Sequence, residues 1–524
     1  MGRFPEIAIA SAMGLLVVVA SYIAGQNSQP WAMLVFWAGV LIIYLPAAAR
    51  LWSQQVIRRE AVALVALMGV LLFLVSLLRS PLHNTYYDEF LHWRTADSIL
   101  RTQHLFSYNY LLPVSSVYPG LEIVTTAIVH LTGLGIFEAG ACVIFSARLV
   151  MIVGLYLVLE RLTGSVRAAG LGALIYMGSS TFVFFDSQFA YGSLSGPLLV
   201  SIVYLILRRT SAQPDMRFIW TSLTIFTIMM VVIVHHITAY ILVGLLVVWT
   251  AAALYLRARG RRRFVPIRIT AFTILWVLVW LLTIAQITIT YLTPHVQQTI
   301  LSALQMMMDL GGDRPVLISA SSGLLSERLV GIASVGFLML GLLLGWFYWW
   351  RQVPQKNALA LTLGLLALVY PALPVLRLNS STWEISNRLA GYIFFALGYI
   401  LGLGLAEAPL TGIWNHARRW LVLPGLGVIL CGGIIAGSHP AARLPGPYMV
   451  EADSRSVDQQ GIASAQWARA VLGPDNRMAS DRVQSILMGA YGGQTLVFRY
   501  NDGINISQFF LLPQLGPEQI QDLQ

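Results

Sequence analysis

Apolar runs of about 18 to 22 residues recur along the whole chain, and each is long enough to cross a bilayer as a single helix. Of the 524 residues, 57% are hydrophobic and only 11% are charged. A soluble domain cannot remove so much apolar surface from water, whereas a membrane surrounds it with an apolar medium. The sequence therefore predicts an all-α polytopic membrane protein.

About 13 of these runs are interpreted as spanning helices, which form the bundle expected between residues 1 and 437. The predicted spans are 6–24, 31–49, 61–78, 139–159, 168–185, 189–207, 218–234, 237–256, 267–292, 329–350, 358–376, 389–410 and 421–437. The first run is too long for a typical signal-peptide core, so we expect it to be retained. Residues 438–524 are polar and are expected to form a small extracytoplasmic region, whose end at Gln524 shows no closing element.

A further apolar run at 118–134 determines the predicted topology. If it spans, the later basic loops fall on the wrong side of the membrane. If it enters and leaves on one face, the basic residues of the short loops, from Arg50 to Arg419, all lie inside. We therefore predict a re-entrant or interfacial helix within a first outer loop at 79–135. The protein is expected in the cytoplasmic membrane with its N-terminus inside and its C-terminus outside.

Charge and cysteine usage exclude several other classes. The net charge of +10 comes mostly from arginine in short loops, which is typical of a topology signal and not of a nucleic-acid surface. Cys142 and Cys431 both fall inside apolar runs, so neither a disulfide framework nor a thiolate metal site is expected. The chain has no Walker-type loop and no dinucleotide fingerprint, which argues against an ATP-driven pump.

Two adjacent carboxylates, Asp88 and Glu89, follow the third run and fall on the predicted outer side. Consecutive helical residues point about 100° apart, so the two acids cannot face the same way. We favour Asp88 for chemistry, with Glu89 beside it in a supporting or capping role. The alternative is an interfacial amphipathic helix whose first turn carries acids because the helix dipole favours them. Tyr87 would shield Asp88, and His92 either orients its carboxylate or lies at the interface. Both are included among the candidate substrate-binding residues.

Other polar residues interrupt or end apolar runs on the same side. Asp186 lies between two runs and is equally compatible with capping the next helix and with function. His235 and His236 occupy a turn, although paired imidazoles form turns less readily than Gly, Asn or Pro. No third metal ligand lies near them in sequence, so hydrogen bonding to a phosphate or sugar hydroxyl is favoured over metal binding.

Two arginines complete the set of candidate substrate-binding residues. Arg388 lies at the outer end of a predicted span, where it either anchors the helix at the interface or grips a phosphate at two points. Arg148 lies inside the span 139–159 and requires a carboxylate, a carbonyl or a ligand as its partner.

The order of several short motifs resembles a known family. The motifs are Asp88-Glu89 in the first outer loop, Tyr118-Pro119-Gly120-Leu121-Glu122, Phe137-Glu138-Ala139, Arg161-Leu162-Thr163-Gly164, and Asp186 about a hundred residues after the first acid. This layout, over roughly residues 60–440, resembles the GT-C superfamily of membrane glycosyltransferases. Two extra helices precede the acidic loop here, where many relatives have one helix, and the region after residue 437 is short beside the larger domains of some relatives.

The resemblance implies a GT-C-like bundle and a specific activity. GT-C enzymes transfer a sugar from a polyprenyl-phosphate carrier, usually outside the cytoplasmic membrane. The family's catalytic carboxylate corresponds to Asp88 with Glu89 as its neighbour, its second acidic position to Asp186, and the basic residue at the carrier phosphate to Arg388.

This chemistry suits the residues present. A carboxylate at the outer surface can take the proton of an acceptor hydroxyl during an inverting displacement at the anomeric carbon. The departing phosphate needs positive charge or hydrogen-bond donors. No cofactor is certain; a divalent cation such as Mg²⁺ or Mn²⁺ remains an option, with ligands drawn from Asp88, Glu89 and Asp186. The expected partners are a polyprenyl-phosphate-linked sugar, a glycan, lipid or protein acceptor, and membrane lipids, but not nucleic acid.

Two hypotheses from other classes remain open. One is a transporter or flippase for a lipid-linked glycan, which should show interrupted helices near the midplane related by an internal repeat. We find no such repeat, and the polar residues gather outside. The other is a non-catalytic scaffold of an envelope-polysaccharide assembly complex, which would not require Asp88.

Overall fold

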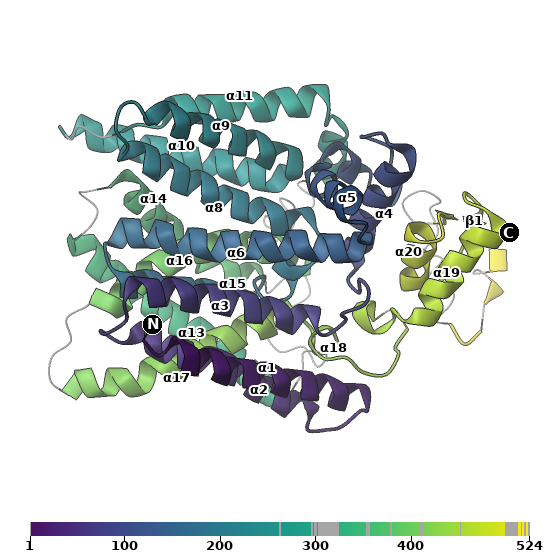
Figure 1. The fold of residues 1–524 in the computed structure, drawn as a ribbon, viewed down its shortest axis with the longest axis horizontal. Helices are drawn as coiled ribbons and strands as arrows, with labels where there is room; N and C mark the ends of the chain where they lie inside the picture. Colours follow the sequence, from purple (N-terminus) through teal and green to yellow (C-terminus); the bar gives the residue numbers. More distant parts are fainter. Residues whose placement is uncertain are drawn as a thin grey trace.

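The computed structural model describes residues 2–260, 264–294, 324–352, 357–377, 380–407, 413–450 and 452–497, together with a few isolated positions. Helices packed side by side make up most of the chain (Figure 1). The elements are α1 Phe4–Gln26, α2 Ala32–Trp52, α3 Arg58–Leu77, α4 Tyr87–Thr102, η1 Pro113–Val117, α5 Gly120–Thr132, α6 Ile136–Thr163, α7 Val166–Met177, η2 Phe185–Ser187, α8 Tyr191–Thr210, α9 Arg217–Val234, α10 His236–Ala258, α11 Ile267–Thr283, α13 Leu325–Gln352, α14 Ala358–Ala367, α15 Ala372–Leu376, α16 Ser380–Glu407, α17 Ile413–Gly437, α18 Pro440–Arg443, η3 Asp453–Arg455, α19 Gln459–Leu472, β1 Arg477–Met478, α20 Arg482–Ala490 and β2 Thr495–Leu496.

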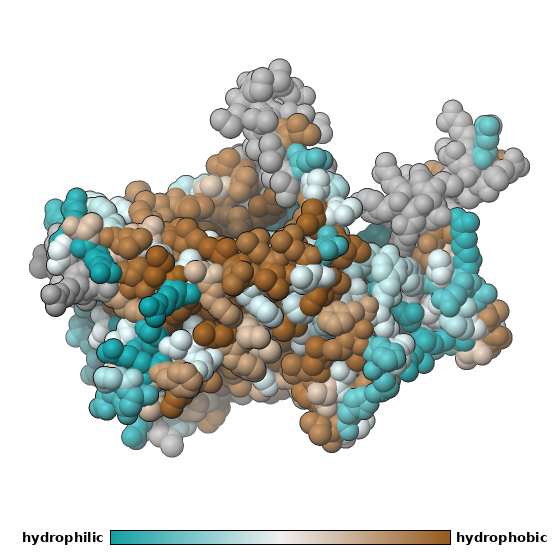
Figure 2. Space-filling model, turned by 90° about the horizontal axis from the view of Figure 1, so that it is seen from above, coloured by the Kyte–Doolittle hydropathy of each residue, from teal (hydrophilic) through white to brown (hydrophobic). Residues whose placement is uncertain are grey.

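Most of the predicted runs form helices of membrane-spanning length. Within the described residues, 10 helices are long and apolar enough to cross a bilayer, or up to 11 if a bent pair is counted as one span. The two remaining predicted spans correspond to shorter apolar helices, α7 and the segment Leu421–Gly437. Figure 2 shows hydrophobic side chains across the middle of one face and hydrophilic ones toward its two ends. The chain is a multi-pass helical membrane protein.

Two predicted spans differ in shape from straight helices. The run 267–292 is broken after Thr283, and the following segment, Ile287–Pro294, turns away by 97°. The run 168–185 is helical only as far as Met177. Hydropathy could not reveal this second change, because apolar side chains continue through Phe182-Val183-Phe184 although the backbone has already left the helix.

Glycines allow α17 and α16 to pack closely against α7 and the turn that follows it. A side-chain carbon at Gly433 or Gly437 would overlap the backbone of Gly178 or Ser180. In a membrane, small residues favour helix association because they let backbones approach closely. These contacts hold the non-helical turn that leads into η2 against the bundle.

The segment 79–135, predicted as the first outer loop, lies across one end of the bundle (Figure 1). In Figure 1, α4 and α5 lie at the end of the spanning helices, next to the C-terminal elements. The run predicted as re-entrant or interfacial forms α5, a helix of 13 residues that is shorter than a span. It ends at Gly133, which adopts a positive φ of 76°.

The C-terminal region packs on this loop. Phe90 and Leu91 of α4 form a small hydrophobic core with residues of α19 and α20, among them Ile486 and Leu487. The strands β1 and β2 pair in parallel over two residues each. The predicted open end at Gln524 lies outside the described residues.

Candidate active site

The start of α4 separates the two adjacent acids. Glu89 is buried, and its carboxylate accepts the backbone N–H groups of Thr85 and Tyr86 at 2.9 Å and of Phe189 at 3.1 Å. It therefore caps α4 and ties it to the segment that enters α8. The side chain of Asp88 is half-buried and lines a cavity, where it is available to a ligand.

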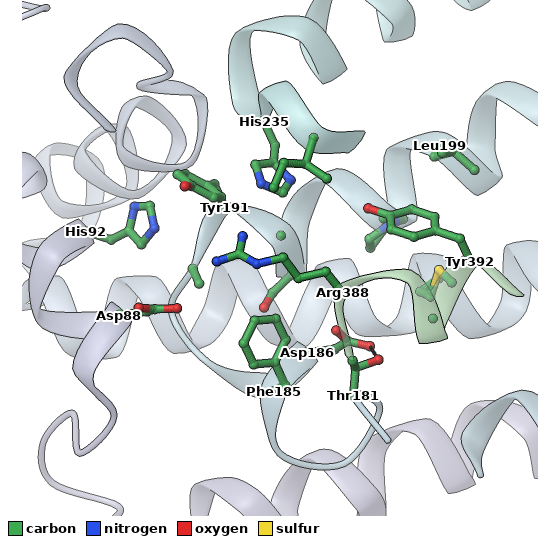
Figure 3. A pocket seen from close by; sticks show the side chains of 18 of the residues that line it. Asp88, His92, Thr181, Phe185, Asp186, Tyr191, Leu199, His235, Arg388 and Tyr392 are labelled. Carbon is green, nitrogen blue, oxygen red and sulfur yellow. Dashed lines mark hydrogen bonds between the residues drawn. The ribbon is translucent and has the colours of Figure 1, made fainter. Parts of the chain in front are cut away.

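This cavity has a volume of about 320 Å³ and is formed by elements far apart in the sequence (Figure 3). It is enclosed by α4, α6, α8 and α16, and by the turns that precede α8 and α10. Its charged and imidazole side chains are Asp88, His92, Arg148, Asp186, His235, Glu384 and Arg388. Most of the residues that the sequence singled out are thus brought together in one space.

Arg388 enters the cavity from the first turns of α16. Its guanidinium donates from Nε and Nη2 to Oε1 of Glu384, at 2.9 and 2.5 Å. The Arg388 side chain is 33% exposed and that of Glu384 is 57% exposed, so this pair remains open to solvent and to a ligand. Figure 3 shows the Arg388 guanidinium extended toward the side of the cavity on which Asp88 and Tyr191 lie.

His92 is held from behind by a carboxylate that the sequence did not single out as its partner. Its Nδ1 lies 2.7 Å from Oε1 of Glu122 on α5, and both side chains are buried. The ring also meets Tyr191 edge-on, with centroids 4.3 Å apart. His92 is therefore an oriented side chain of the cavity wall and not an exposed interfacial residue, and its second nitrogen is not engaged by Glu122.

Asp186 lies on η2 and not at a helix start. Its carboxylate accepts from the Thr181 hydroxyl at 3.0 Å, so it does not cap α8. Arg148 fixes the same turn, because its guanidinium donates to the Phe182 carbonyl and, at 2.9 Å, to the Ser187 hydroxyl. A carbonyl and a hydroxyl thus partner Nη2 of this buried arginine, whereas its Nε has no hydrogen-bond partner among the described residues.

The two neighbouring histidines have different surroundings. His235 lines the cavity, stacks on Tyr191 with centroids 4.2 Å apart, and places Nδ1 2.8 Å from the Thr238 hydroxyl. His236 is buried behind it against Tyr118 and is not among the residues that line this cavity. Only one of the two histidines predicted to bind substrate therefore faces this space.

Burial dominates the electrostatics of the site. It raises the pKa of the Asp88 carboxyl above its ordinary value, while the nearby charges of His92 and Arg388 act in the opposite direction. Burial also raises the pKa of Glu89, although its three backbone N–H donors act to lower it. It raises the pKa of Asp186 in the same way, although the charge of Arg148 acts to lower it. The pKa of His235 is held well below its usual value by burial, so this ring is neutral at physiological pH.

The described residues provide no group of three or more side chains suited to hold a metal ion. Glu89 uses both carboxylate oxygens on backbone N–H groups, so the predicted ligand set is reduced to Asp88 and Asp186. Both line the cavity. A cation there would need further ligands from the substrate or solvent.

Several cavity residues were not identified from the sequence. Tyr191 contacts His92 and His235, and the Tyr392 hydroxyl lies 2.6 Å from that of Thr238. Single aromatic residues near helix ends resemble ordinary interfacial anchors, so they carry no specific signal. Glu384 did carry a signal in the sequence, because it lies four residues before Arg388 on the same helix face, a spacing at which opposite charges pair.

Comparison with known proteins agrees with this architecture. No protein-family profile matches the sequence, and no curated protein matches it. The structure is similar to that of ArnT from Cupriavidus metallidurans bound to undecaprenyl phosphate, with a TM-score of 0.51 and 15% identity over 83% of this chain and 85% of that one. The apo state of the same protein gives a TM-score of 0.48 at 15% identity over 83% and 84% of the two chains.

A further similarity, with a TM-score of 0.48 and 11% identity, is to the Archaeoglobus fulgidus oligosaccharyltransferase in complex with Zn and sulfate, over 82% of this chain and 62% of that one. The conclusion drawn from these comparisons rests on the similarity to ArnT bound to undecaprenyl phosphate. Because the two sequences are only 15% identical, this similarity shows a shared fold and nothing more. The chain has the polytopic GT-C fold, as the sequence motifs predict.

Proposed function

We propose that this protein is a glycosyltransferase that moves a sugar from a polyprenyl-phosphate carrier to an acceptor on the outer face of the cytoplasmic membrane. One observation carries the proposal. Asp88, Asp186 and Arg388 come from three separate elements of a GT-C fold and line a single cavity. The similar ArnT structure holds undecaprenyl phosphate, which supports a carrier of this chemical class.

The cavity is divided in a way that suits an amphipathic donor. Asp88 on α4 and Arg388 near the start of α16 lie toward one end of it, whereas Met151, Leu199 and Phe395 line it further along α6, α8 and α16. A sugar phosphate would occupy the polar end, and the first isoprene units the apolar part. Pockets of this kind are mostly apolar, with a few polar groups that fix the orientation of the ligand.

In the reaction, Asp88 takes the proton from the acceptor hydroxyl as its oxygen attacks the anomeric carbon. The bond between that carbon and the carrier phosphate breaks, and its electron pair leaves with the phosphate as polyprenyl phosphate. The proton remains on Asp88. A single displacement from the opposite face inverts the configuration. The pKa of Asp88 is raised by burial, which makes it a stronger base than an exposed carboxylate.

The other cavity residues bind and orient. Arg388 stabilises the charge that develops on the departing phosphate, because its guanidinium presents several N–H donors in a fixed plane. Glu384 holds that guanidinium in place. Asp186 accepts hydrogen bonds from sugar hydroxyls, and neutral His235 offers a further polar contact beside them. The acceptor approaches Asp88 from the side of Tyr87 and the C-terminal region.

A transfer assay in proteoliposomes tests this function. Wild-type protein is reconstituted with polyprenyl-phosphate sugars that carry a labelled sugar, and labelled product and labelled carrier in each leaflet are measured. We expect label to pass from the carrier to an acceptor and the anomeric configuration to invert. Movement of intact carrier between leaflets, without transfer for any donor sugar, would instead identify a flippase.

A further inference from the structure

A second polar groove lies at the same end of the molecule, outside the cavity described above. It has a volume of about 350 Å³ and shares no lining residue with that cavity. It is formed by the end of α1, the segment after α3, and the segment from α18 to the start of α19, which meet near α18 in Figure 1. Arg79 and Arg455 line it from opposite parts of the chain.

Arg79 is a buried cation with spare hydrogen-bonding capacity. The residue is only 7% exposed, and Nη1 donates to the Thr85 hydroxyl at 3.0 Å. Its Nε is buried and has no hydrogen-bond partner among the described residues. The guanidinium also lies over the ring of Tyr86, 5.4 Å from its centroid. The charge of Arg79 acts on the Glu89 carboxylate and lowers its pKa, but no carboxylate of the described residues lies within salt-bridge distance of the guanidinium. A buried charge without a directly bonded anion is costly, so an incoming anion would find a prepared partner.

Arg455 adds a second positive charge from the C-terminal region. It donates from Nε and Nη2 to the Leu444 carbonyl at 3.3 and 3.2 Å. A Cβ at Gly446 would lie 2.6 Å from the Arg455 guanidinium carbon, so glycine leaves the space that this side chain occupies. Burial and the nearby charge of Arg79 both lower the pKa of Arg455. The two guanidinium groups therefore repel each other across the groove.

Acidic and imidazole groups in the groove do not neutralise this pair. Within the described part of the chain, neither arginine has a carboxylate within salt-bridge distance. Asp458 lines the groove but its carboxylate accepts from the Gly461 N–H at 2.7 Å and caps α19. His83 places Nδ1 3.0 Å from the carbonyl oxygen of Asn84.

The groove lies beside the ends of two spans, where lipid headgroups are expected. Gln26 is the last residue of the span α1, and Arg79 follows the span α3 by two residues. Leu82 lines the groove although it is 71% exposed, and Tyr448 lines it at 48% exposure. Apolar side chains beside a paired positive site suit a ligand that has both a charged group and a hydrocarbon part.

We propose that Arg79 and Arg455 together bind the phosphate of a lipid headgroup in the outer leaflet. Guanidinium groups match the oxygens of a phosphate through parallel N–H donors. Such a lipid would connect the end of α3 to the C-terminal region, which also packs on α4 beside the cavity. The proposal does not depend on the proposed transfer reaction.

Native mass spectrometry of the full-length protein in detergent tests this site. Phosphatidylglycerol and diacylglycerol with the same acyl chains are titrated into wild-type protein and into Arg79→Gln and Arg455→Gln variants. We expect wild-type protein to retain phosphatidylglycerol in preference to diacylglycerol, and each variant to bind it about tenfold or more weakly. Arg101→Gln removes the same charge from an exposed position outside the groove and should leave binding unchanged.

The design separates loss of the site from loss of folding. Arg79→Lys retains a positive charge and should bind more strongly than Arg79→Gln, and thermal unfolding is measured for each variant. Equal retention of the two lipids, or equal binding by wild-type and both glutamine variants, would overturn the proposal. Inorganic phosphate that binds as tightly as phosphatidylglycerol would show that the site takes free phosphate and not a lipid. Asp88→Asn should bind phosphatidylglycerol as wild-type does, whatever its transfer activity.

Discussion

Two arginine and glutamate pairs in this molecule are built in opposite ways. Arg443 is 1% exposed and donates to both carboxylate oxygens of Glu327, at 3.1 and 2.8 Å, while Trp37 donates to the same carboxylate at 3.0 Å. In the cavity, Arg388 uses only one oxygen of Glu384, and both side chains remain partly exposed. We call the buried pair of Arg443 and Glu327 the closed pair, and the partly exposed pair of Arg388 and Glu384 the open pair.

The difference separates charges that hold the fold from charges that are available to a ligand. The closed pair joins α18 to α13 and α2, so the C-terminal region is attached to the spans by a buried ion pair in which both carboxylate oxygens accept from Arg443. The open pair lies beside Asp88 and Asp186 in a cavity. Partly satisfied polar groups are costly when buried, and a site retains them when a ligand completes their contacts.

The largest expected effect on stability comes from breaking the closed pair. Arg443→Gln leaves the Glu327 carboxylate buried with fewer partners, and should lower the free energy of unfolding by about 3–5 kcal/mol. Thermal unfolding in detergent measures this loss. Arg388→Gln is the matched change at the open pair and should cost less than about 1 kcal/mol, because that pair is solvent-exposed. Equal losses in the two variants would contradict the distinction.

A smaller effect on stability should separate the two adjacent acids. Glu89→Gln replaces one carboxylate oxygen with an NH₂ group that cannot accept from the backbone, so a buried N–H loses its partner at a cost of about 1–3 kcal/mol. Asp88→Asn is the same chemical change one residue earlier. It should leave the melting temperature at neutral pH unchanged or slightly raised, because burial already disfavours the charged form of Asp88. A larger loss of stability in Asp88→Asn than in Glu89→Gln would contradict the assignment of Glu89 as the capping residue.

The smallest effect is a shift in the pH dependence of transfer. Asp88 must be ionised to accept a proton, so the rate should fall as the pH drops through a pKa that burial has raised above the ordinary carboxyl value. Arg388 lowers that pKa and Glu384 raises it. The acid limb should therefore move to higher pH in Arg388→Gln and to lower pH in Glu384→Gln. An acid limb that neither variant moves would show that Asp88 does not determine it.

The bundle was predictable from the sequence because hydropathy acts over long, nearly continuous runs. The candidate site was partly predictable for a related reason, since Asp88, Asp186 and Arg388 are polar residues at the ends of such runs on the same predicted side. Helical spacing also predicted that the two adjacent acids point in different directions. In the structure, Glu89 caps α4 and Asp88 faces the cavity. The role of each residue in catalysis remains a prediction.

The remaining features depend on contacts between distant segments. The pairing of His92 with Glu122 arises only when α5 packs against α4, and no local pattern connects residues thirty positions apart. The end of α7 at Met177 and the bend after Thr283 both lie in runs that stay apolar. Hydropathy cannot detect such breaks, because packing against neighbouring helices stabilises the backbone there.

The central claim is that Asp88 acts on the reaction while Arg388 acts on the carrier phosphate, within one cavity. The direct test measures, for the same Asp88→Asn protein, the dissociation constant for polyprenyl phosphate and the single-turnover rate of sugar transfer. Asp475→Asn, an exposed acid on the C-terminal region, serves as the control. We predict carrier binding close to wild type and transfer slower by about 10²- to 10⁴-fold. Transfer at the wild-type rate in Asp88→Asn would contradict the assignment of the base.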